Sequence, residues 1–466
     1  MNRDDMLIGG TWRRAARTID VENPATAEVV GTAALGQADD VDVAVAAARD
    51  ALEGWRSTPA PERARLLDRL VEVLQERRDE LVEWTVAEVG APVSIAGPWH
   101  VDVSLDILRS AAEHGRALTN PTFDGVTVLQ RSAGVAALIT PWNYPLYQLA
   151  AKVGSAFAAG CTVVHKPAEL TPMTAYVFAE ATVEAGLPAG VFNLVPGTGL
   201  DVGAPLAAHR GVDVVSFTGS TEVGRQVAAA AVGHIARVTL ELGGKSSSIV
   251  CDDADLELAV RATVESCMLN SGQTCSALTR LLVPADRLDE AVRIAAEHAD
   301  AMVVGDPQDP QTELGPLISA VQRQRVQQHV TEAVQRGARI ATSSTAPVPE
   351  AGHYLRPVVL TDLDPTDPAS QEEIFGPVLV VHGVTDDDHA IAVANGTPYG
   401  LAGGVWSADE DRAAAIAGRL DTGQVFINDA EFSVESPFGG WKRSGFGREL
   451  GAHALSEFTE LTAVHR

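Results

Sequence analysis

The sequence predicts an α/β protein built on parallel sheets. Short apolar runs rich in Val and Ile alternate along the chain with longer amphipathic stretches, which is typical of buried parallel strands joined by helical crossovers. The chain has 466 residues, of which 46% are hydrophobic and 21% charged. This composition excludes disordered and disulfide-scaffold proteins, and the length allows two large domains.

We expect a first group of helices and strands before residue 244. Residues 41–86 hold two helical patterns with charged, solvated faces. The strand and helix periods then alternate from residue 134 onward. We expect strands at 135–139, 162–164, 191–195 and 212–217, and helices at 145–159, 174–185 and 221–231.

A second α/β stretch follows. We expect helices at 255–268, 288–302 and 320–337. The polar segment 342–350 is interpreted as a surface loop, and 362–368 as a turn-rich connection. No internal repeat or low-complexity linker interrupts the pattern, so two domains are expected.

Charge and cysteine usage exclude several function classes. Lys and Arg total 35 against 62 Asp and Glu, giving a net charge of −27 at pH 7, which disfavours nucleic-acid and anionic-membrane partners. The uncharged stretch 132–151 contains Pro141 and Asn143 and is interpreted as a strand entering a helix. No secretion signal is recognised. The four cysteines show no disulfide or zinc pattern, so no metal site is expected, and a reducing cytoplasm fits best.

Cys275 is the candidate nucleophile. It follows a polar, glycine-bearing loop at residues 271–276, whereas a structural thiol usually stands in an apolar run. Cys161, Cys251 and Cys267 fit the role of buried structural thiols. A nucleophilic role for Cys275 requires a base and an oxyanion donor nearby.

Glu241 is the candidate base. It ends an apolar strand just before two glycines, where open α/β sheets place active-site groups, and partial burial there raises a carboxyl pKa. The alternative is an ordinary ion pair with Lys245 or Arg237.

Asn143 is the candidate oxyanion donor. Pro145 favours the first position of a helix, so Asn143 stands just before a helix N-terminus, where the helix dipole is positive. An amide donor there suits a developing alkoxide. The alternative is simple helix capping.

Two strand ends are candidates for a dinucleotide site. Residues 217–224 form a strand, a glycine turn and a helix start, a geometry that binds pyrophosphate. The GxGxxG fingerprint is absent, so an ordinary βα turn is the alternative. Lys166 and Glu169 follow another strand and suit a ribose.

The combined motifs resemble the aldehyde dehydrogenase superfamily. They stand in the family's order at residues 141–145 (PWNYP), 166–169 (KPAE), 217–220 (FTGS), 241–245 (ELGGK), 272–275 (GQTC), 372–377 (EEIFGP) and 436–440 (SPFGG). The resemblance covers nearly the whole chain. It implies a Rossmann-like NAD-binding domain at 1–115 and 133–243, an α/β catalytic domain at 244–443, and a small β oligomerisation element at 116–132 and 444–466. A homodimer or homotetramer is therefore expected.

The resemblance also implies a mechanism. Cys275 would attack the aldehyde to give a thiohemiacetal, whose oxyanion the Asn143 side chain and the Cys275 backbone N–H would hold. After hydride transfer to NAD, water activated by Glu241 would hydrolyse the thioester. Lys152 and Glu449 match family residues that relay protons, with a structural ion pair as the alternative.

The implied cofactor is NAD. The residues that match the family's cofactor contacts are Ile139, Trp142, Lys166, Glu169, Gly219, Ser220, Glu373 and Phe375. Because Glu169 would repel a 2′-phosphate by about 4 kcal/mol per charge pair at roughly 4 Å and an effective dielectric constant of about 20, NAD is expected over NADP.

The substrate is a small-molecule aldehyde of undetermined identity. The residues expected to line its tunnel are Tyr144, Gln148, Ala151, Phe432 and Phe438, with Tyr147 or Phe432 filling space beside Ala151. Arg280 and Arg443 are interpreted as structural. Two alternatives remain open: a coenzyme A-acylating semialdehyde dehydrogenase, which would generally lack the Glu241 carboxylate, and a catalytically silent relative with a structural or binding role.

Overall fold

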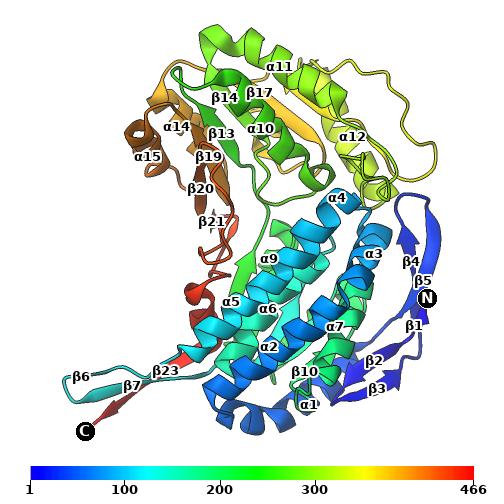
Figure 1. The fold of residues 1–466 in the computed structure, drawn as a ribbon, viewed down its shortest axis with the longest axis vertical. Coiled ribbons are helices and arrows are strands. Elements are labelled where there is room, and N and C mark those ends of the chain that lie inside the picture. The colour runs from blue at the N-terminus through cyan, green and yellow to red at the C-terminus, as the bar shows by residue number, and fades with distance from the viewer. Residues whose placement is uncertain (1) are drawn as a thin grey trace.

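Two α/β bodies lie side by side, and a β arm extends away from one of them (Figure 1). The structure is a computed structural model that describes residues 2–466. Each body is built around one mostly parallel sheet, so the predicted α/β class is confirmed. Within the described residues, no helix has both the length and the apolar character needed to cross a membrane.

The first body surrounds an eight-stranded sheet of order β22-β12-β11-β8-β9-β10-β2-β3. Its strands are β2 (Asp5–Ile8), β3 (Thr11–Arg14), β8 (Val135–Ile139), β9 (Thr162–Lys166), β10 (Phe192–Leu194), β11 (Val214–Thr218), β12 (Arg237–Glu241) and β22 (Gly445–Phe446). The five strands from β12 to β10 run parallel. From β8 the chain adds β9 and β10 on one side and then crosses to β11 on the other side. Such a change of direction creates a crevice at the carboxyl ends of the strands.

The helices of this body pack on both faces of the sheet. They are α1 (Ala38–Ser57), α2 (Ala60–Glu76), α3 (Arg78–Val89), α5 (Val103–Arg116), α6 (Pro145–Ala159), α7 (Met173–Glu184), α8 (Ala204–Ala208) and α9 (Thr221–Val232). The prediction of two helical patterns in 41–86 is wrong, since three helices cover this region. Arg77 alone separates α2 from α3, and without Gly or Pro the break is invisible to pattern analysis. Helix α6 is buried along nearly its whole length, which explains the uncharged stretch before Lys152.

The second body surrounds a seven-stranded sheet of order β15-β16-β17-β14-β13-β19-β20. Its strands are β13 (Ser247–Val250), β14 (Arg280–Pro284), β15 (Arg339–Ile340), β16 (Val358–Thr361), β17 (Val378–Val384), β19 (Ala402–Trp406) and β20 (Gln424–Ile427). The helices are α10 (Leu256–Met268), α11 (Leu288–Ala301), α12 (Ala320–Gln335), α13 (Pro368–Gln371), α14 (Asp387–Asn395) and α15 (Glu410–Ala417). The predicted helices α10, α11 and α12 are confirmed to within two residues, and 342–350 forms no helix or strand.

The arm is a three-stranded antiparallel sheet of order β23-β7-β6. It joins β6 (Thr122–Phe123) and β7 (Val126–Ser132) to the C-terminal strand β23 (Thr459–His465). Strand β22 pairs with β12 at the edge of the first sheet, so part of 444–466 lies outside the arm. The domain boundaries given above stay a prediction.

Short elements complete the fold. They are β1 (Asn2–Arg3), β4 (Thr18–Asn23), β5 (Glu28–Ala34), α4 (Val93–Ile95), the π-helix Ala96–Asp102, the π-helix Gly199–Gly203, the 3-10 turns Leu269–Gly272, Ala285–Arg287 and Ala452–Phe458, and the pair β18 (Tyr399–Gly400) and β21 (Trp441–Lys442).

Candidate active site

The loop that carries Cys275 joins α10 to β14 and has an unusual backbone. Asn270, Ser271 and Gly272 all have positive φ, at 53°, 57° and 74°, a costly conformation for the two residues that carry a Cβ. A Cβ on Gly272 would lie 2.2 Å from the backbone of Gly376, so only glycine fits there. The Asn270 side chain donates a hydrogen bond to the Asn143 carbonyl at 3.0 Å. The loop is thus fixed against the segment that precedes α6.

The Cys275 thiol is half-buried, whereas the other three cysteines are buried. Burial, followed by the negative charges of Glu373 and Glu241, raises the pKa of Cys275 to about 12. The thiol is therefore protonated at neutral pH in this arrangement, and a base must take its proton before it attacks.

Asn143 lies beside the nucleophile loop. Its Nδ2 donates a hydrogen bond to the carbonyl of Gln273 at 2.9 Å. The N-cap of α6 is Tyr144, with no side-chain capping bond, so the helix-capping alternative for Asn143 is wrong. An amide NH2 has two N–H donors, and the second has no partner among residues 2–466. Asn143 can therefore donate to an oxyanion formed next to Cys275.

Glu241 ends β12 as a buried carboxylate without a hydrogen bond. It is 3% exposed, and neither carboxylate oxygen has a partner within the described chain. The ion-pair alternative is wrong because Arg237 pairs with Glu460 and the Lys245 amino group has no hydrogen-bond partner there. Burial, followed by the charge of Glu449, raises the pKa of Glu241 well above its usual value.

Lys152 and Glu449 form a buried ion pair behind this base. The Lys152 Nζ also donates to the Thr218 hydroxyl at 2.6 Å. Lys152 lowers the pKa of Glu241, whereas Glu449 raises it. The structural ion pair that was the alternative for Lys152 and Glu449 is therefore present. Its two charges also shift the pKa of the candidate base Glu241.

The base and the nucleophile come from different bodies and meet where the two sheets face each other. Glu241 closes β12 of the first sheet, and Cys275 precedes β14 of the second. The connection through Gly244 brings them together, since a Cβ on Gly244 would lie 2.6 Å from the Cys275 carbonyl. A Cβ on Gly439 would lie 2.8 Å from Glu241 Oε1. Close backbone packing thus holds the three segments together.

The predicted cofactor residues surround the crevice of the first sheet. Ile139 at the end of β8 pairs in register with Lys166 at the end of β9. Lys166 Nζ donates to Glu169 at 3.0 Å, which leaves two ammonium N–H donors for a ligand. Gly219 and Ser220 stand at the N-terminus of α9, and the Ser220 hydroxyl caps that helix. A cation, a carboxylate and a helix N-terminus are the groups that ribose hydroxyls and a pyrophosphate require, so the crevice fits a dinucleotide.

A second group of predicted residues lies between this crevice and Cys275. Glu373 accepts a hydrogen bond from the Gly244 N–H at 3.0 Å, and burial raises the pKa of Glu373 to about 7. The rings of Trp142 and Phe375 pack edge to face with centroids 5.3 Å apart. These residues border the path from the crevice to the thiol.

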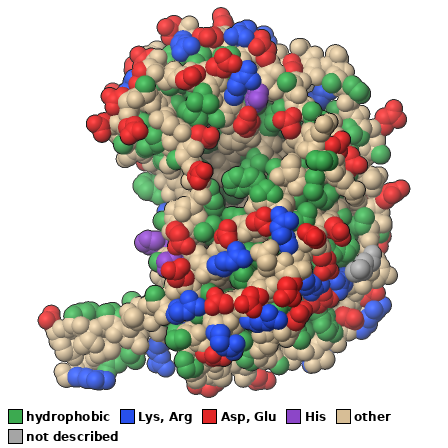
Figure 2. Space-filling view, in the orientation of Figure 1, with side chains coloured by type: hydrophobic (Ala, Val, Ile, Leu, Met, Phe, Trp, Pro, Cys, Tyr) green, Lys and Arg blue, Asp and Glu red, His purple; other side chains and the backbone are tan. Residues whose placement is uncertain are grey.

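A cavity of about 450 Å³ has Cys275 in its wall. Its wall contains Tyr144, Gln148, Phe432 and Phe438, as expected for a substrate tunnel. Ala151 is not in this wall and is 1% exposed within the core. The wall residues that the sequence analysis did not assign to the tunnel include Trp99, Val103, Leu269, Leu278, Trp406 and Phe426. Figure 2 shows hydrophobic side chains gathered in the hollow between the two bodies.

No local sequence pattern points to these additional wall residues. Trp99 and Val103 come from the π-helix Ala96–Asp102 and the start of α5, and Trp406 and Phe426 come from the strands β19 and β20. They converge only in the folded chain. Tyr147 also lines the cavity, and its position three residues after Tyr144 on one helix face was the signal available for it.

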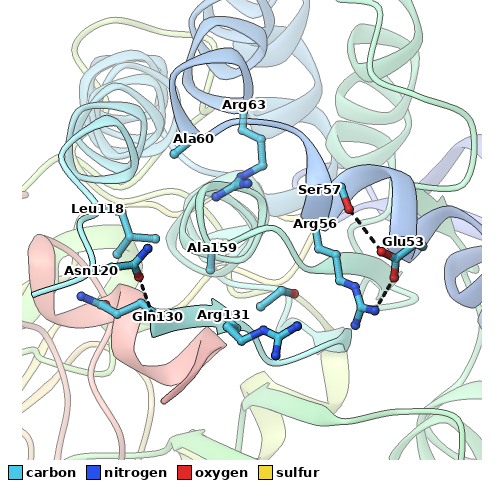
Figure 3. A pocket seen from close by; sticks show the side chains of 11 residues that line it. Glu53, Arg56, Ser57, Ala60, Arg63, Leu118, Asn120, Gln130, Arg131 and Ala159 are labelled. Carbon is cyan, nitrogen blue, oxygen red and sulfur yellow. Dashed lines mark hydrogen bonds and ion pairs between the residues drawn. The ribbon is translucent and has the colours of Figure 1, made fainter. Parts of the chain in front are cut away.

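A smaller cavity of about 290 Å³ lies near the arm and contains none of the predicted site residues. Figure 3 shows Arg56 paired with Glu53. Arg63 donates to the backbone carbonyls of Ala158 and Thr58. The guanidinium groups of Arg56 and Arg63 already have partners within the protein, so they are not available to bind a substrate. This smaller cavity is therefore not a candidate active site.

Arg280 was interpreted as a structural residue. It is buried and donates to the carbonyls of Lys245, Val393 and Ala394, which confirms this interpretation.

Within residues 2–466, no group of three or more His, Cys, Asp or Glu side chains is placed to hold a metal ion.

Comparison with known proteins gives consistent matches over the whole chain. A family model described as "Aldehyde dehydrogenase family" matches residues 12–464. The chain is 44% identical over 466 residues to a Pseudomonas 3-succinoylsemialdehyde-pyridine dehydrogenase, covering 99% of this chain and 98% of the relative. It is 40% identical over 465 residues to a putative aldehyde dehydrogenase of Staphylococcus aureus, covering 98% and 97%.

Solved structures agree with these matches. A cysteine-to-alanine mutant of aldehyde dehydrogenase C from Pseudomonas syringae, in complex with NAD+ and octanal, superposes with a TM-score of 0.97 at 43% identity, covering 99% of this chain and 96% of that chain. The NAD+ complex of an aldehyde dehydrogenase from Bacillus cereus gives a TM-score of 0.96 at 36% identity, covering 99% and 96%.

Proposed function

Because the chain belongs to the aldehyde dehydrogenase family, we propose that it oxidises an aldehyde to the carboxylic acid with NAD, using Cys275, Glu241 and Asn143. The observation that carries the proposal is the buried Glu241 carboxylate, which has no hydrogen-bond partner within the described chain and lies close enough to Cys275 for its charge to raise the pKa of the thiol. A carboxylate without a hydrogen bond is costly to bury, and its raised pKa suits a general base.

The first half of the reaction forms a thioester. The Cys275 thiol loses its proton to a base, and its Sγ adds to the aldehyde carbon to give a thiohemiacetal. The Asn143 amide and the Cys275 backbone N–H hold the oxyanion, a contribution of about 3 kcal/mol for one such donor. When bound, NAD supplies the hydride acceptor that oxidises this carbon.

The second half of the reaction hydrolyses the thioester and regenerates the Cys275 thiol. Glu241 takes a proton from a water molecule, and the resulting hydroxide adds to the thioester carbon. The C–S bond then breaks, the acid leaves, and the sulfur is reprotonated. The charges of Lys152 and Glu449 act on Glu241, and Lys152 also donates to the Thr218 hydroxyl. We propose that this ion pair carries the proton of Glu241 away.

NAD fits the residues of the first body. Lys166 and Glu169 would bind the adenosine ribose, Gly219 and Ser220 the pyrophosphate, and Glu373 the nicotinamide ribose. Ile139, Trp142 and Phe375 would form the apolar walls beside them. The carboxylate of Glu169 favours NAD over NADP, because a 2′-phosphate would bring like charge against it.

The wall of the cavity favours large uncharged aldehydes. Its lining is largely aromatic and aliphatic, and among the described residues it contains Glu265, Asp429 and Glu431 but no Lys, Arg or His. One relative was solved in complex with octanal, and another is named a 3-succinoylsemialdehyde-pyridine dehydrogenase. We therefore propose an aliphatic or aromatic aldehyde, with aldehydes that end in a carboxylate disfavoured by repulsion.

We also propose that the protein works in the cytoplasm as a homo-oligomer. A nucleophilic thiol at Cys275 functions only when reduced, and the cytoplasm keeps thiols reduced. The arm exposes Phe123 at 57% and Leu461 at 67%, and exposed apolar residues on a projecting sheet are typical of an interface. The assembly would be a dimer or a tetramer.

An aldehyde panel with NAD tests the proposal. Purified protein is mixed with octanal, an aromatic aldehyde and a chain-matched aldehyde that ends in a carboxylate, without coenzyme A, and NADH is followed by absorbance. We expect NADH and free acid from the first two, and a lower kcat/KM for the third. Cys275→Ala should abolish NADH formation, whereas Cys251→Ala, a buried thiol elsewhere, serves as the matched control.

Three outcomes would contradict the proposal. NADH that forms only after coenzyme A is added, with an acyl-coenzyme A thioester as the product in place of free acid, would favour the acylating alternative. NADH formation that survives in Cys275→Ala would remove this thiol from the mechanism, and an inactive wild-type protein would favour the catalytically silent alternative.

A further inference from the structure

The substrate cavity contains a buried amide that the protein leaves without a hydrogen bond. Gln148 is 2% exposed and lines the cavity. Its Oε1 accepts no hydrogen bond from any of residues 2–466. Other buried polar groups of the same wall have partners: the Tyr144 hydroxyl bonds to Thr274 at 2.8 Å, and the Thr263 hydroxyl donates to Ser248 at 2.8 Å. Gln148 is therefore the exception among them.

The position of Gln148 places this amide beyond the reacting thiol. Tyr144, Tyr147 and Gln148 share one face of α6, at positions i, i+3 and i+4, and all three line the cavity. Tyr144 contacts the nucleophile loop through Thr274, so Gln148 lies one helical turn further along the wall. An aldehyde held at Cys275 would extend its chain past this amide.

The surroundings make an unpartnered amide unfavourable without a ligand. The same wall carries Leu269, Leu278 and Phe432, and methionine at position 148 would match the length of glutamine without burying a polar group. A glutamine amide can rotate to present either its oxygen or its NH2. It can therefore accept from a hydroxyl or donate to a carbonyl or a ring nitrogen.

We propose that Gln148 is a specificity residue that hydrogen-bonds a neutral polar group within the chain of the aldehyde substrate. The substrate class is then a large aliphatic or aromatic aldehyde that carries a ketone, hydroxyl or ring nitrogen beyond the reacting carbon. This inference rests on the proposed function, because it assigns a contact within the same cavity. An apolar aldehyde of the same length fits the cavity but leaves the amide without a partner.

A chain-matched series tests the proposal. Straight-chain aldehydes of equal length carry one ketone at carbon 4, 5, 6 or 7, and the unsubstituted alkanal is the reference. The quantity compared is the ratio of kcat/KM for each oxo-aldehyde to that of the alkanal, in wild type, Gln148→Met and Gln424→Met. Gln424 lines the other side of the cavity and is half-buried, so water already solvates its amide.

We expect the ratio for the best oxo-aldehyde to fall about tenfold in Gln148→Met, the effect of one neutral hydrogen bond, and to stay at the wild-type value in Gln424→Met. We also expect the melting temperature of Gln148→Met to equal or exceed that of wild type, since an unpaired buried amide is removed. An unchanged ratio, or an equal fall in Gln424→Met, would overturn the inference while leaving alkanal oxidation, and so the proposed function, intact. A wild-type protein that oxidises none of these aldehydes would overturn both.

Discussion

Among single residues, the candidate site is marked by buried polar side chains that lack hydrogen-bond partners among the residues that the structure describes. Glu241 is buried with no hydrogen bond in the described chain, and the pKa values of Glu241 and Cys275 are both raised by burial. Each raised pKa shifts its group toward the protonated form, whereas the reaction uses both groups deprotonated. Deprotonation of both groups is therefore harder than in water, and it becomes easier as the pH rises.

These two shifts predict how the rate depends on pH. A carboxyl or thiol with a raised pKa becomes deprotonated only at higher pH, so kcat/KM should rise from neutral into alkaline solution. Steady-state NADH formation across this range measures the profile. A rate that is flat from pH 6 upward would contradict the raised pKa values.

Removing the base separates the two halves of the reaction. Glu241→Gln keeps the shape of the side chain but cannot take a proton from water, so hydrolysis should slow by about 10²–10⁴-fold. If another group takes the thiol proton, rapid mixing with octanal should still show a burst of NADH, close to one per site. Steady-state turnover equal to wild type would exclude Glu241 as the hydrolytic base.

We expect Glu169 to control the choice between NAD and NADP. Its carboxylate is 35% exposed and pairs with Lys166 at 3.0 Å. Glu169→Gln removes the charge that would face a 2′-phosphate, so the ratio of kcat/KM for NADP to that for NAD should rise by about tenfold or more. Glu222→Gln, on the exposed surface of α9, is the control. A ratio unchanged in Glu169→Gln would place cofactor discrimination elsewhere.

At the scale of elements, a buried ion pair joins α6 to the C-terminal segment. The side chains of Lys152 and Glu449 are 0% and 6% exposed. Lys152→Met leaves Glu449 buried without its partner, which should reduce the free energy of unfolding by about 3–5 kcal/mol. Chemical denaturation measures the loss.

Two further variants check this prediction. Lys152→Met combined with Glu449→Leu removes both charges and should recover much of the stability. Arg65→Met breaks an exposed pair with Glu62 and should leave the denaturation midpoint nearly unchanged. A single Lys152→Met variant as stable as wild type would contradict the prediction that this buried ion pair stabilises the fold.

The bounds of individual helices and strands were predicted correctly where the local sequence pattern was strong. The bounds of β8 (Val135–Ile139) and α6 (Pro145–Ala159) match the prediction, because an apolar β-branched run and Pro145 at a helix start are strong local signals. The break between α2 and α3 at Arg77 was missed. It is decided by how the two helices pack, which local periodicity does not encode.

At the scale of the whole molecule, two sheets and an arm determine what the protein can do. The crevice that fits NAD belongs to the first sheet, the nucleophile loop to the second, and the arm projects away from both (Figure 1). We propose that this division separates cofactor binding, chemistry and assembly.

The arm gives a prediction about assembly. Leu461→Asp places a charge on an exposed apolar position of β23, which should disfavour association and lower the mass measured by light scattering after size exclusion. Leu258→Asp, at an exposed position on α10, is the matched control and should keep the wild-type mass. A Leu461→Asp variant with wild-type mass would show that the arm does not hold the assembly together.

Strand and helix periods and the short motifs around Asn143, Glu241 and Cys275 are local properties of the chain, so they were enough to assign the fold class, the family and the chemical types at the site. The alternatives were resolved only in the folded protein: within the described residues Glu241 has no ion pair, Asn143 bonds to Gln273, and the Gln148 Oε1 has no hydrogen-bond partner. Burial and hydrogen-bond partners depend on segments more than a hundred residues apart, whose packing no local pattern records.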